Sequence, residues 1–243
     1  ADGDLDRAET LAREVATMYW ARRFDLEPEV FTPAEAIEKG QKIPGGPIVL
    51  VEAADCCGGG AVGDSIATLR ALLEADAAGI VQVVDPEAAV LCHQSGIETE
   101  VTFPLGHKLD PRWGKPIPVT GKVTGLSDGQ FTYAGGIWDG VEGQMGPSAV
   151  LTVGNVQILI ASHATYDWLD EQYQSLNLDP STAKFVVVKN PMNYRMVFEE
   201  IAKEVFILNT PGPTPPTVRH ISFQKLKRPY FPLDENIPGM EPE

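Results

Sequence analysis

The chain has 243 residues, and its 34 Asp and Glu against 19 Lys and Arg give a net charge of -15 at pH 7. This acidic balance repels phosphate backbones and anionic lipid, so we expect no nucleic acid and no membrane as partner. Apolar residues make up 43%, which suffices for an ordinary globular core. The three cysteines, two of them adjacent (Cys56 and Cys57), form no disulfide framework and favour a cytoplasmic location.

The first 46 residues predict a helical arm. Apolar residues from Leu5 to Tyr19 recur at intervals of three and four, which is typical of an amphipathic helix. A second helix should begin after Thr32, with Glu35 as its capping partner. Pro44-Gly45-Gly46-Pro47 then breaks the chain. We therefore divide it into a helical arm or linker, residues 1–46, and a main domain, residues 47–243.

The main domain opens with a strand, a glycine loop and a helix. Residues 48–54 read as a buried strand, 55–63 as the loop and 64–77 as the helix. A second buried strand, 80–84, precedes Asp85-Pro86, a typical helix start. This alternation of strands and helices indicates an α/β fold with parallel strands.

The pattern changes between residues 98 and 162. Short apolar runs and turn signals predict an antiparallel sheet or a small barrel-like insert, with hairpin turns at Ser127-Asp128-Gly129 and Gly154-Asn155. A strand (185–188), a helix (191–203) and a strand (205–208) follow, and then a Pro-rich tail, residues 211–243. The predicted fold is α/β: strand–glycine loop–helix units on a mainly parallel sheet, with an antiparallel β insert and an N-terminal helical arm.

The loop from Asp55 to Ser65 is the sharpest local feature. Gly58, Gly60 and Gly63 match the dinucleotide pattern G-x-G-x-x-G, and Asp85 lies about 20 residues further on. Asp64 would place negative charge where a pyrophosphate binds, however, and a helix cap explains Asp85. Two other interpretations stay open: Asp64 or Ser65 caps the following helix, or the loop lines a substrate cleft at the strand ends. The lining residues would then be Asp55, Gly58, Gly59, Gly60, Gly63, Asp64 and Ser65.

A second strand-to-helix junction follows residue 188. Lys189 ends a buried strand, and Asn190 or Asn193 would cap the next helix. In the functional interpretation, Lys189 and Arg195 form an electropositive wall of the same cleft, since ligands gather at strand ends. In the structural interpretation, the asparagine only caps the helix and Arg195 is an ordinary surface residue.

No catalytic or metal-ligating set is visible. His93, His107, His163 and His220 are isolated and read as surface or packing residues, and neither H-x-x-x-H nor C-x-x-C occurs. There is also no G-x-S-x-G and no S-x-x-K. Cys56 or Cys57 could have a lowered pKa beside a helix start, but no histidine can be assigned as its base. We assign no catalytic residue and no metal ligand in this chain.

Several separated motifs resemble the C-terminal region of the MlrC-like (microcystin-degradation protein C) family, described as zinc metallopeptidases. The resemblance runs from about Pro47 to Asp234. It rests on the run from Asp55 to Ser65, on Asp85-Pro86-Glu87-Ala88, on Val187-Val188-Lys189 with Arg195, and on Arg228-Pro229-Tyr230-Phe231-Pro232-Leu233-Asp234. The chain differs from the usual pattern in two places: Cys56-Cys57 replaces Asn-Pro, and Asn193-Tyr194-Arg195 lacks a histidine that commonly precedes the aromatic residue.

The resemblance implies a longer protein whose metal ligands lie in an N-terminal half. The expected function is the C-terminal half of a zinc-dependent peptide or amide hydrolase that lines the active-site cleft. Zinc is expected in the full-length protein and not on this chain. The expected partners are the N-terminal half, a peptide or amide small-molecule substrate and a second copy in a homo-oligomer. The alternatives are a nucleotide- or small-ligand-binding module using the Gly58–Gly63 loop, and a structural or assembly domain.

Overall fold

The computed structural model describes residues 2–237 and separates into two compact units. One unit joins the two ends of the chain, Ala1–Glu29 and Thr217–Glu243, and the other contains Val30–Pro216. The last residues of the predicted tail, 238–243, lie outside the described residues. The domain boundary that we predict at residue 46 stays a prediction.

The unit formed by the chain ends contains one helix, α1 (Leu5–Ala21), as the periodicity predicts. Asp4 caps it, and its carboxylate accepts a hydrogen bond from the Arg7 amide at 3.0 Å. None of the helix residues is buried. Beyond the helix, Phe24 stacks edge-to-face on Phe231 with ring centroids 5.4 Å apart, and this contact joins the two chain ends.

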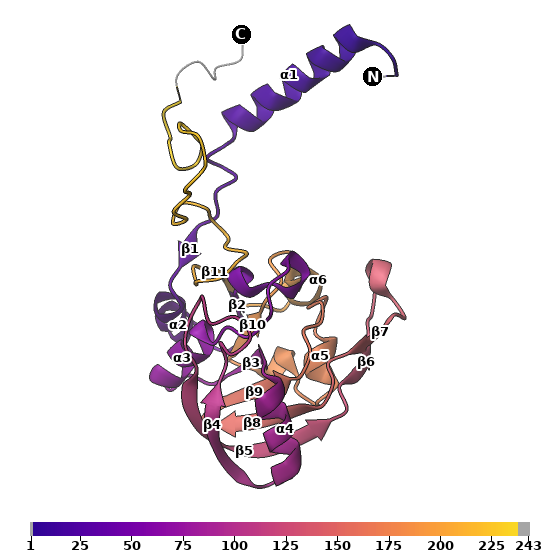
Figure 1. Ribbon diagram of the computed structural model, residues 1–243, viewed down its shortest axis with the longest axis vertical. Coiled ribbons are helices and arrows are strands. Elements are labelled where there is room, and N and C mark those ends of the chain that lie inside the picture. Colours follow the sequence, from indigo (N-terminus) through magenta and orange to yellow (C-terminus); the bar gives the residue numbers. More distant parts are fainter. Residues whose placement is uncertain (1, 238–243) are drawn as a thin grey trace. The chain divides into compact units, whose positions relative to one another are not determined.

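The larger unit is built on a nine-stranded sheet (Figure 1). Its parallel part contains, in spatial order, β1 (Val30–Phe31), β11 (Glu204–Leu208), β2 (Ile48–Val51), β10 (Phe185–Val188), β3 (Gly79–Val84) and β9 (Val156–Ala161). The antiparallel strands β8 (Ser148–Val153), β5 (Ile117–Ser127) and β4 (Glu100–Leu105) continue it. A separate small sheet pairs β6 (Gln130–Thr132) with β7 (Glu142–Gln144). The α/β class with a mainly parallel sheet is confirmed.

Two apolar layers cover the two faces of the sheet. Alternate strand residues point to opposite sides, so Ile48 and Leu50 belong to one core and Val49 and Val51 to the other. The first core is covered by α2 (Pro33–Gln41), α3 (Ala67–Glu74) and α4 (Pro86–Ser95). The second is covered by α5 (Glu171–Gln174), α6 (Tyr194–Phe198) and the β6–β7 sheet. The core is therefore continuous on both faces of the strands that precede the glycine loop and Lys189.

Local sequence signals account for several element ends. Thr32 and Glu35 form the predicted capping box at the start of α2. Asp85 caps α4 by accepting from the Ala88 amide at 3.1 Å. Gly154, with φ of +56°, makes the predicted tight turn between the paired strands β8 and β9.

Four predicted elements differ from the structure. The strand expected at 48–54 ends at Val51 and is followed by a 3-10 turn, Ala53–Asp55. The helix expected at 64–77 is confined to Ala67–Glu74, and the helix expected at 191–203 to Tyr194–Phe198. The turn at residues 127–129 does not connect paired strands, because β5 pairs with β8 and β6 pairs with β7. The antiparallel strands extend the main sheet and close no barrel among the described residues.

Within residues 2–237, no helix combines the length and the apolar character that crossing a bilayer requires.

Candidate functional site

The glycine loop leaves β2 as two single turns of 3-10 helix, Ala53–Asp55 and Cys57–Gly59. Gly60 and Gly63 then adopt left-handed backbone conformations, with φ of +95° and +81°, which glycine adopts without strain. The Asp55 carboxylate folds back across the loop and accepts hydrogen bonds from the amides of Gly63 at 2.9 Å and Ser65 at 2.8 Å. The Asp55 carboxylate therefore holds the two ends of the loop together.

Lys189 completes this closure from the neighbouring strand. Parallel register places Val188 of β10 beside Val51 of β2, so the residues that follow these strands meet at one edge of the sheet. The Lys189 ammonium lies 2.7 Å from the Asp55 carboxylate and also donates to the carbonyls of Gly63 at 3.0 Å and Ser65 at 3.1 Å. All three ammonium protons are thus used inside the protein.

A second carboxylate, Glu52, lies beneath the same loop and is fully buried. Its Oε1 accepts a hydrogen bond from the Ser65 hydroxyl at 2.7 Å, whereas its Oε2 has no partner among the described residues. Burial raises the pKa of Glu52, and the Lys189 ammonium opposes that change. The loop therefore rests on a buried polar cluster of Glu52, Asp55, Ser65 and Lys189.

Asp167 joins this cluster, although the sequence analysis does not single it out. Its carboxylate accepts a hydrogen bond from the Lys189 amide at 2.7 Å, and its carbonyl accepts from the Asn190 side chain at 2.6 Å. Burial raises the pKa of Asp167 to about 6. The residue lies in an irregular segment with no motif around it, so only the tertiary fold reveals its position.

Asn190 shapes the start of the second junction. Its side-chain oxygen accepts hydrogen bonds from the amides of Met192 at 2.9 Å and Asn193 at 3.1 Å. Of the two predicted capping residues, Asn190 therefore provides the side-chain bonds, while Asn193 occupies the N-cap position of α6 without capping it.

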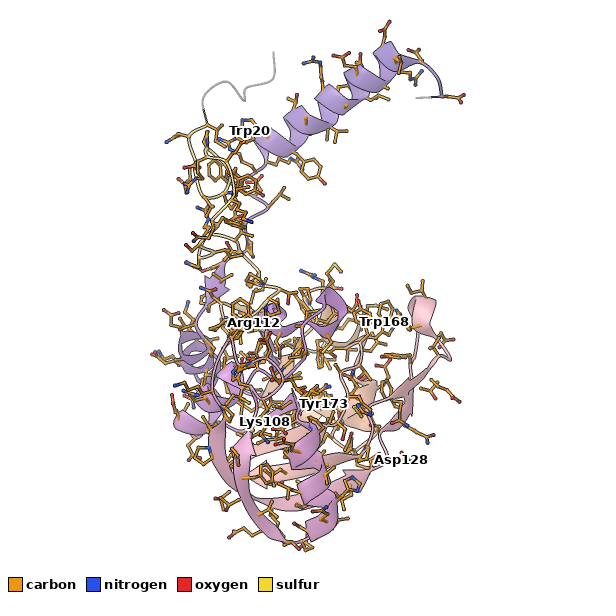
Figure 2. The ribbon with its side chains drawn as sticks, in the orientation of Figure 1. Trp20, Lys108, Arg112, Asp128, Trp168 and Tyr173 are labelled. Atoms are coloured by element: carbon orange, nitrogen blue, oxygen red, sulfur yellow. The ribbon has the colours of Figure 1, made fainter. Side chains whose placement is uncertain are left out.

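A pocket of about 540 Å³ lies above the cluster, on the outer side of the glycine loop. Its lining residues are Cys56, Gly58, Gly59, Trp138, Tyr166, Asn190, Pro191 and Met192. The Tyr166 ring lies so close to Gly58 that a Cβ there would be 2.2 Å from it, so glycine is required for this approach. Trp138 and Trp168 flank Tyr166 with ring centroids 5.8 Å away on each side, and Trp168 is labelled in Figure 2.

The residues predicted to line a cleft fall into two sets. Gly58 and Gly59 line this pocket, and Gly60 is exposed beside them. The buried set lies under the loop and comprises Asp55, Gly63, Asp64, Ser65 and Lys189. Arg195 is exposed on α6 and stacks on the Tyr194 ring, 4.9 Å from its centroid. The structure thus brings Asp55, Gly63, Ser65 and Lys189 into contact and leaves Arg195 outside that cluster; their role at a substrate cleft stays a prediction.

Asp64 and Asp85 have structural partners. Asp64 accepts hydrogen bonds from the amides of Leu109 at 2.8 Å and Asp110 at 2.9 Å, so it holds the loop after β4 and caps no helix. Besides capping α4, Asp85 accepts from the Gly106 amide and the Lys108 ammonium, each at 3.0 Å. The interpretation of Asp85 as a helix cap is confirmed, and both of its oxygens are used within the fold.

The structure does not support the possibility that Cys56 or Cys57 has a lowered pKa. Burial raises the pKa of Cys57 to about 12 and also raises that of Cys56, because a thiolate loses hydration in the protein interior. Among residues 2–237, His, Cys, Asp and Glu form no group of three or more placed to hold a metal ion.

Comparison with known proteins places this architecture in a family. The family model described as MlrC C-terminus matches residues 50–225. Microcystinase C of Sphingomonas sp. is 24% identical over 238 residues, which cover 96% of this chain and 45% of that protein. The crystal structure of a candidate metallopeptidase from Mesorhizobium sp. BNC1 superposes with a TM-score of 0.77 at 24% identity, over 91% of this chain and 44% of that one. The chain spans less than half the length of either relative, and it belongs to the MlrC C-terminal family.

Proposed function

We propose that this chain is the C-terminal half of a zinc-dependent peptide or amide hydrolase, in which the glycine loop forms one wall of the substrate cleft. The observation that carries the proposal is the pocket bounded by Gly58, Gly59 and Tyr166 at the carboxyl edge of the parallel sheet. Ligands of α/β proteins bind at this edge. Membership of the MlrC C-terminal family supports a role in a peptidase.

The buried cluster gives this wall a fixed shape. Asp55 and Lys189 hold the loop from below, and Tyr166 packs on Gly58 from above. The loop backbone and the aromatic rings are then preorganised for a peptide, whose amide groups need hydrogen-bond partners and whose apolar side chains need a hydrophobic surface.

The metal belongs to another part of the proposed enzyme. The donors of residues 2–237 form no suitable group, so the proposed ligands lie in the N-terminal half that binds this chain. A hydrolytic metal would supply an activated water there. The residues of this chain would position the substrate and exclude solvent. A cytoplasmic location belongs to the same proposal, since Cys56, Cys57 and Cys92 form no disulfide.

The test uses the protein that joins this chain to its N-terminal half. Hydrolysis of a set of short peptides should be lost on chelation and restored by zinc. Met192→Ala removes a side chain that lines the pocket and is 62% exposed, so it should raise KM with little change in folding. Met196→Ala is the matched control, because Met196 is 56% exposed on α6 and does not line the pocket. Peptide hydrolysis that persists in chelator, or equal kinetics for the two variants, would contradict the proposal.

The assembly alternative has one supporting observation. No residue of helix α1 is buried, and the helix presents Leu5, Val15 and Met18 to solvent, with exposed fractions of 82%, 53% and 64%. An apolar stripe of this kind suits contact with a protein partner such as the N-terminal half or a second copy. Gel filtration with light scattering would test it: deletion of residues 1–21 should abolish any dimer, and a monomeric intact chain excludes the second copy.

A further inference from the structure

A second pocket, of about 460 Å³, lies at the carboxyl end of β11 and shares no residue with the glycine-loop pocket. The starts of two helices line it, α2 through Thr32 and Pro33 and α3 through Ile66 and Ala67. Ile66, at the N-cap position of α3, makes no side-chain cap, but the Ser65 hydroxyl accepts a hydrogen bond from the Ala67 amide at 3.3 Å, as one of the predicted capping residues.

His107 is the unusual residue in this wall. It is only 5% exposed, and its Nδ1 has no hydrogen-bond partner among the described residues. Its backbone φ of +48° lies in the left-handed region, which is uncommon for residues other than glycine. Strained, unsatisfied polar residues concentrate at binding and catalytic sites. Burial lowers the pKa of His107, so the ring is neutral at pH 7 and carries one N–H to donate.

Gly114 allows the histidine ring to occupy this position. A Cβ on Gly114 would lie 2.4 Å from His107 Nε2 and within 2.7 Å of two further ring atoms. Trp113, beside this glycine, contributes an aromatic side chain to the same pocket. The wall therefore combines a confined imidazole with apolar surface.

Two of the three charged side chains that line the pocket, apart from His107, are cationic. Arg70 and Lys115 line it and form no ion pair within the part of the chain that the structure describes, while Glu74 is the one acidic residue among the lining residues. Thr210, also in the wall, is 4% exposed, and its hydroxyl has no partner among the described residues. On a chain with a net charge of -15, the lining of this pocket thus has one more cation than it has acidic residues, beside two buried polar groups without partners among the described residues.

We propose that this pocket binds a small organic carboxylate, with its anionic group held by Arg70, Lys115 and the His107 ring, and its apolar part against Trp113 and Ile66. The carboxylate accepts from the cationic side chains and the imidazole N–H, which removes the imbalance of charge at the pocket. The apolar lining favours an amino-acid-sized ligand over inorganic phosphate, because phosphate has no apolar surface to bury in the pocket.

The test is calorimetric titration of the intact chain with N-acetyl-leucine, with N-acetyl-leucine amide as the neutral counterpart and inorganic phosphate as the third ligand. Saturable binding of the carboxylate, with a dissociation constant on the order of millimolar, is expected, together with a shift of the His107 ring signals in NMR spectra. The amide should bind at least tenfold more weakly, because it lacks the charge that Arg70 and Lys115 recognise. Equal binding of acid and amide, or no binding of either, would overturn the proposal. Phosphate binding without carboxylate binding would assign the pocket to a phosphate group instead.

Matched variants locate the binding. Arg70→Ala should weaken it roughly tenfold, which corresponds to about 1.4 kcal/mol for a lost charged hydrogen bond. His107→Asn keeps a residue that tolerates positive φ, and Gly114→Ala displaces the ring without changing His107; each should reduce the affinity. Lys203→Ala, at an exposed lysine that does not line the pocket, is the control and should leave the affinity unchanged. If Lys203→Ala lost as much affinity as Arg70→Ala, the change in net charge alone would explain both losses, and the proposed site would be rejected.

Discussion

Replacing Lys189 with methionine should destabilise the protein strongly. The substitution keeps the length of the side chain and removes an ammonium that lies 2.7 Å from the Asp55 carboxylate, in a pair whose side chains are 5% and 4% exposed. Asp55 would keep only the amides of Gly63 and Ser65, and the carbonyls of the same two residues would lose a donor. Breaking a buried ion pair on one side costs about 3–5 kcal/mol, and we expect a loss in that range for Lys189→Met.

The assay is urea unfolding followed by far-UV circular dichroism and by tryptophan fluorescence. Lys42→Met is the control, because Lys42 pairs with Glu38 at 2.6 Å on the surface of α2, with both side chains about 70% exposed. That variant should lose about 0.3–0.5 kcal/mol. The double variant Asp55→Leu with Lys189→Met removes both charges and should lose less stability than the sum of its two single variants, because neither charge is left buried without its partner. A loss below about 1 kcal/mol in Lys189→Met, or a double variant as unstable as the sum of its single variants, would refute the reasoning.

Three further predictions concern neighbouring groups. The Asp167 carboxyl should titrate near pH 6 in carbon NMR spectra; because its pKa rises from 3.8 on folding, the folded state binds the extra proton and the contribution of Asp167 to stability should fall as pH rises from 3.8 to about 6. A midpoint near 4 would contradict its burial. Gly58→Ala should cost about 1–3 kcal/mol in urea unfolding, since the new Cβ would lie 2.2 Å from the Tyr166 ring, and an unchanged midpoint would show that the ring moves freely. Tyr173→Phe, at the position labelled in Figure 2, removes a buried hydroxyl that donates to the Val187 carbonyl at 2.7 Å and should cost about 1 kcal/mol; equal stability of variant and parent would show that this bond contributes nothing net.

The fold could be predicted where its signals are local. Strands β2 and β10 are buried on both faces, so their sequences are continuous apolar runs that need no partner to be recognised. The capping box at Thr32 and the cap at Asp85 involve residues three positions apart. Strand pairing is different, because it depends on distant segments. The sequence around Ser127 indicates a turn, but only the complete sheet shows that β5 pairs with β8 rather than with β6.

The candidate site could be predicted only in part, for the same reason. Two loops at the carboxyl ends of neighbouring strands were expected to meet, and Asp55 and Lys189 do contact each other. The sequence pattern does not show, however, that both side chains are buried. Lys189 donates to three acceptors inside the protein and is not available to a ligand. Asp167 and His107 have no motif around them. Their perturbed pKa values arise from desolvation by the assembled fold.

The crossing of distant segments at the glycine loop has a consequence for synthesis. Asp55 contacts Lys189, which follows it by 134 residues, and the Thr214 hydroxyl donates to the Ala53 carbonyl across 161 residues. On the ribosome, Asp55 emerges 134 residues before Lys189 and Ala53 emerges 161 residues before Thr214, so neither contact can form until those later residues have left the exit tunnel. The Asp55 carboxylate therefore lacks its lysine partner while the intervening residues are made, and this edge of the sheet is completed only after β11 and the segment that follows it have been made.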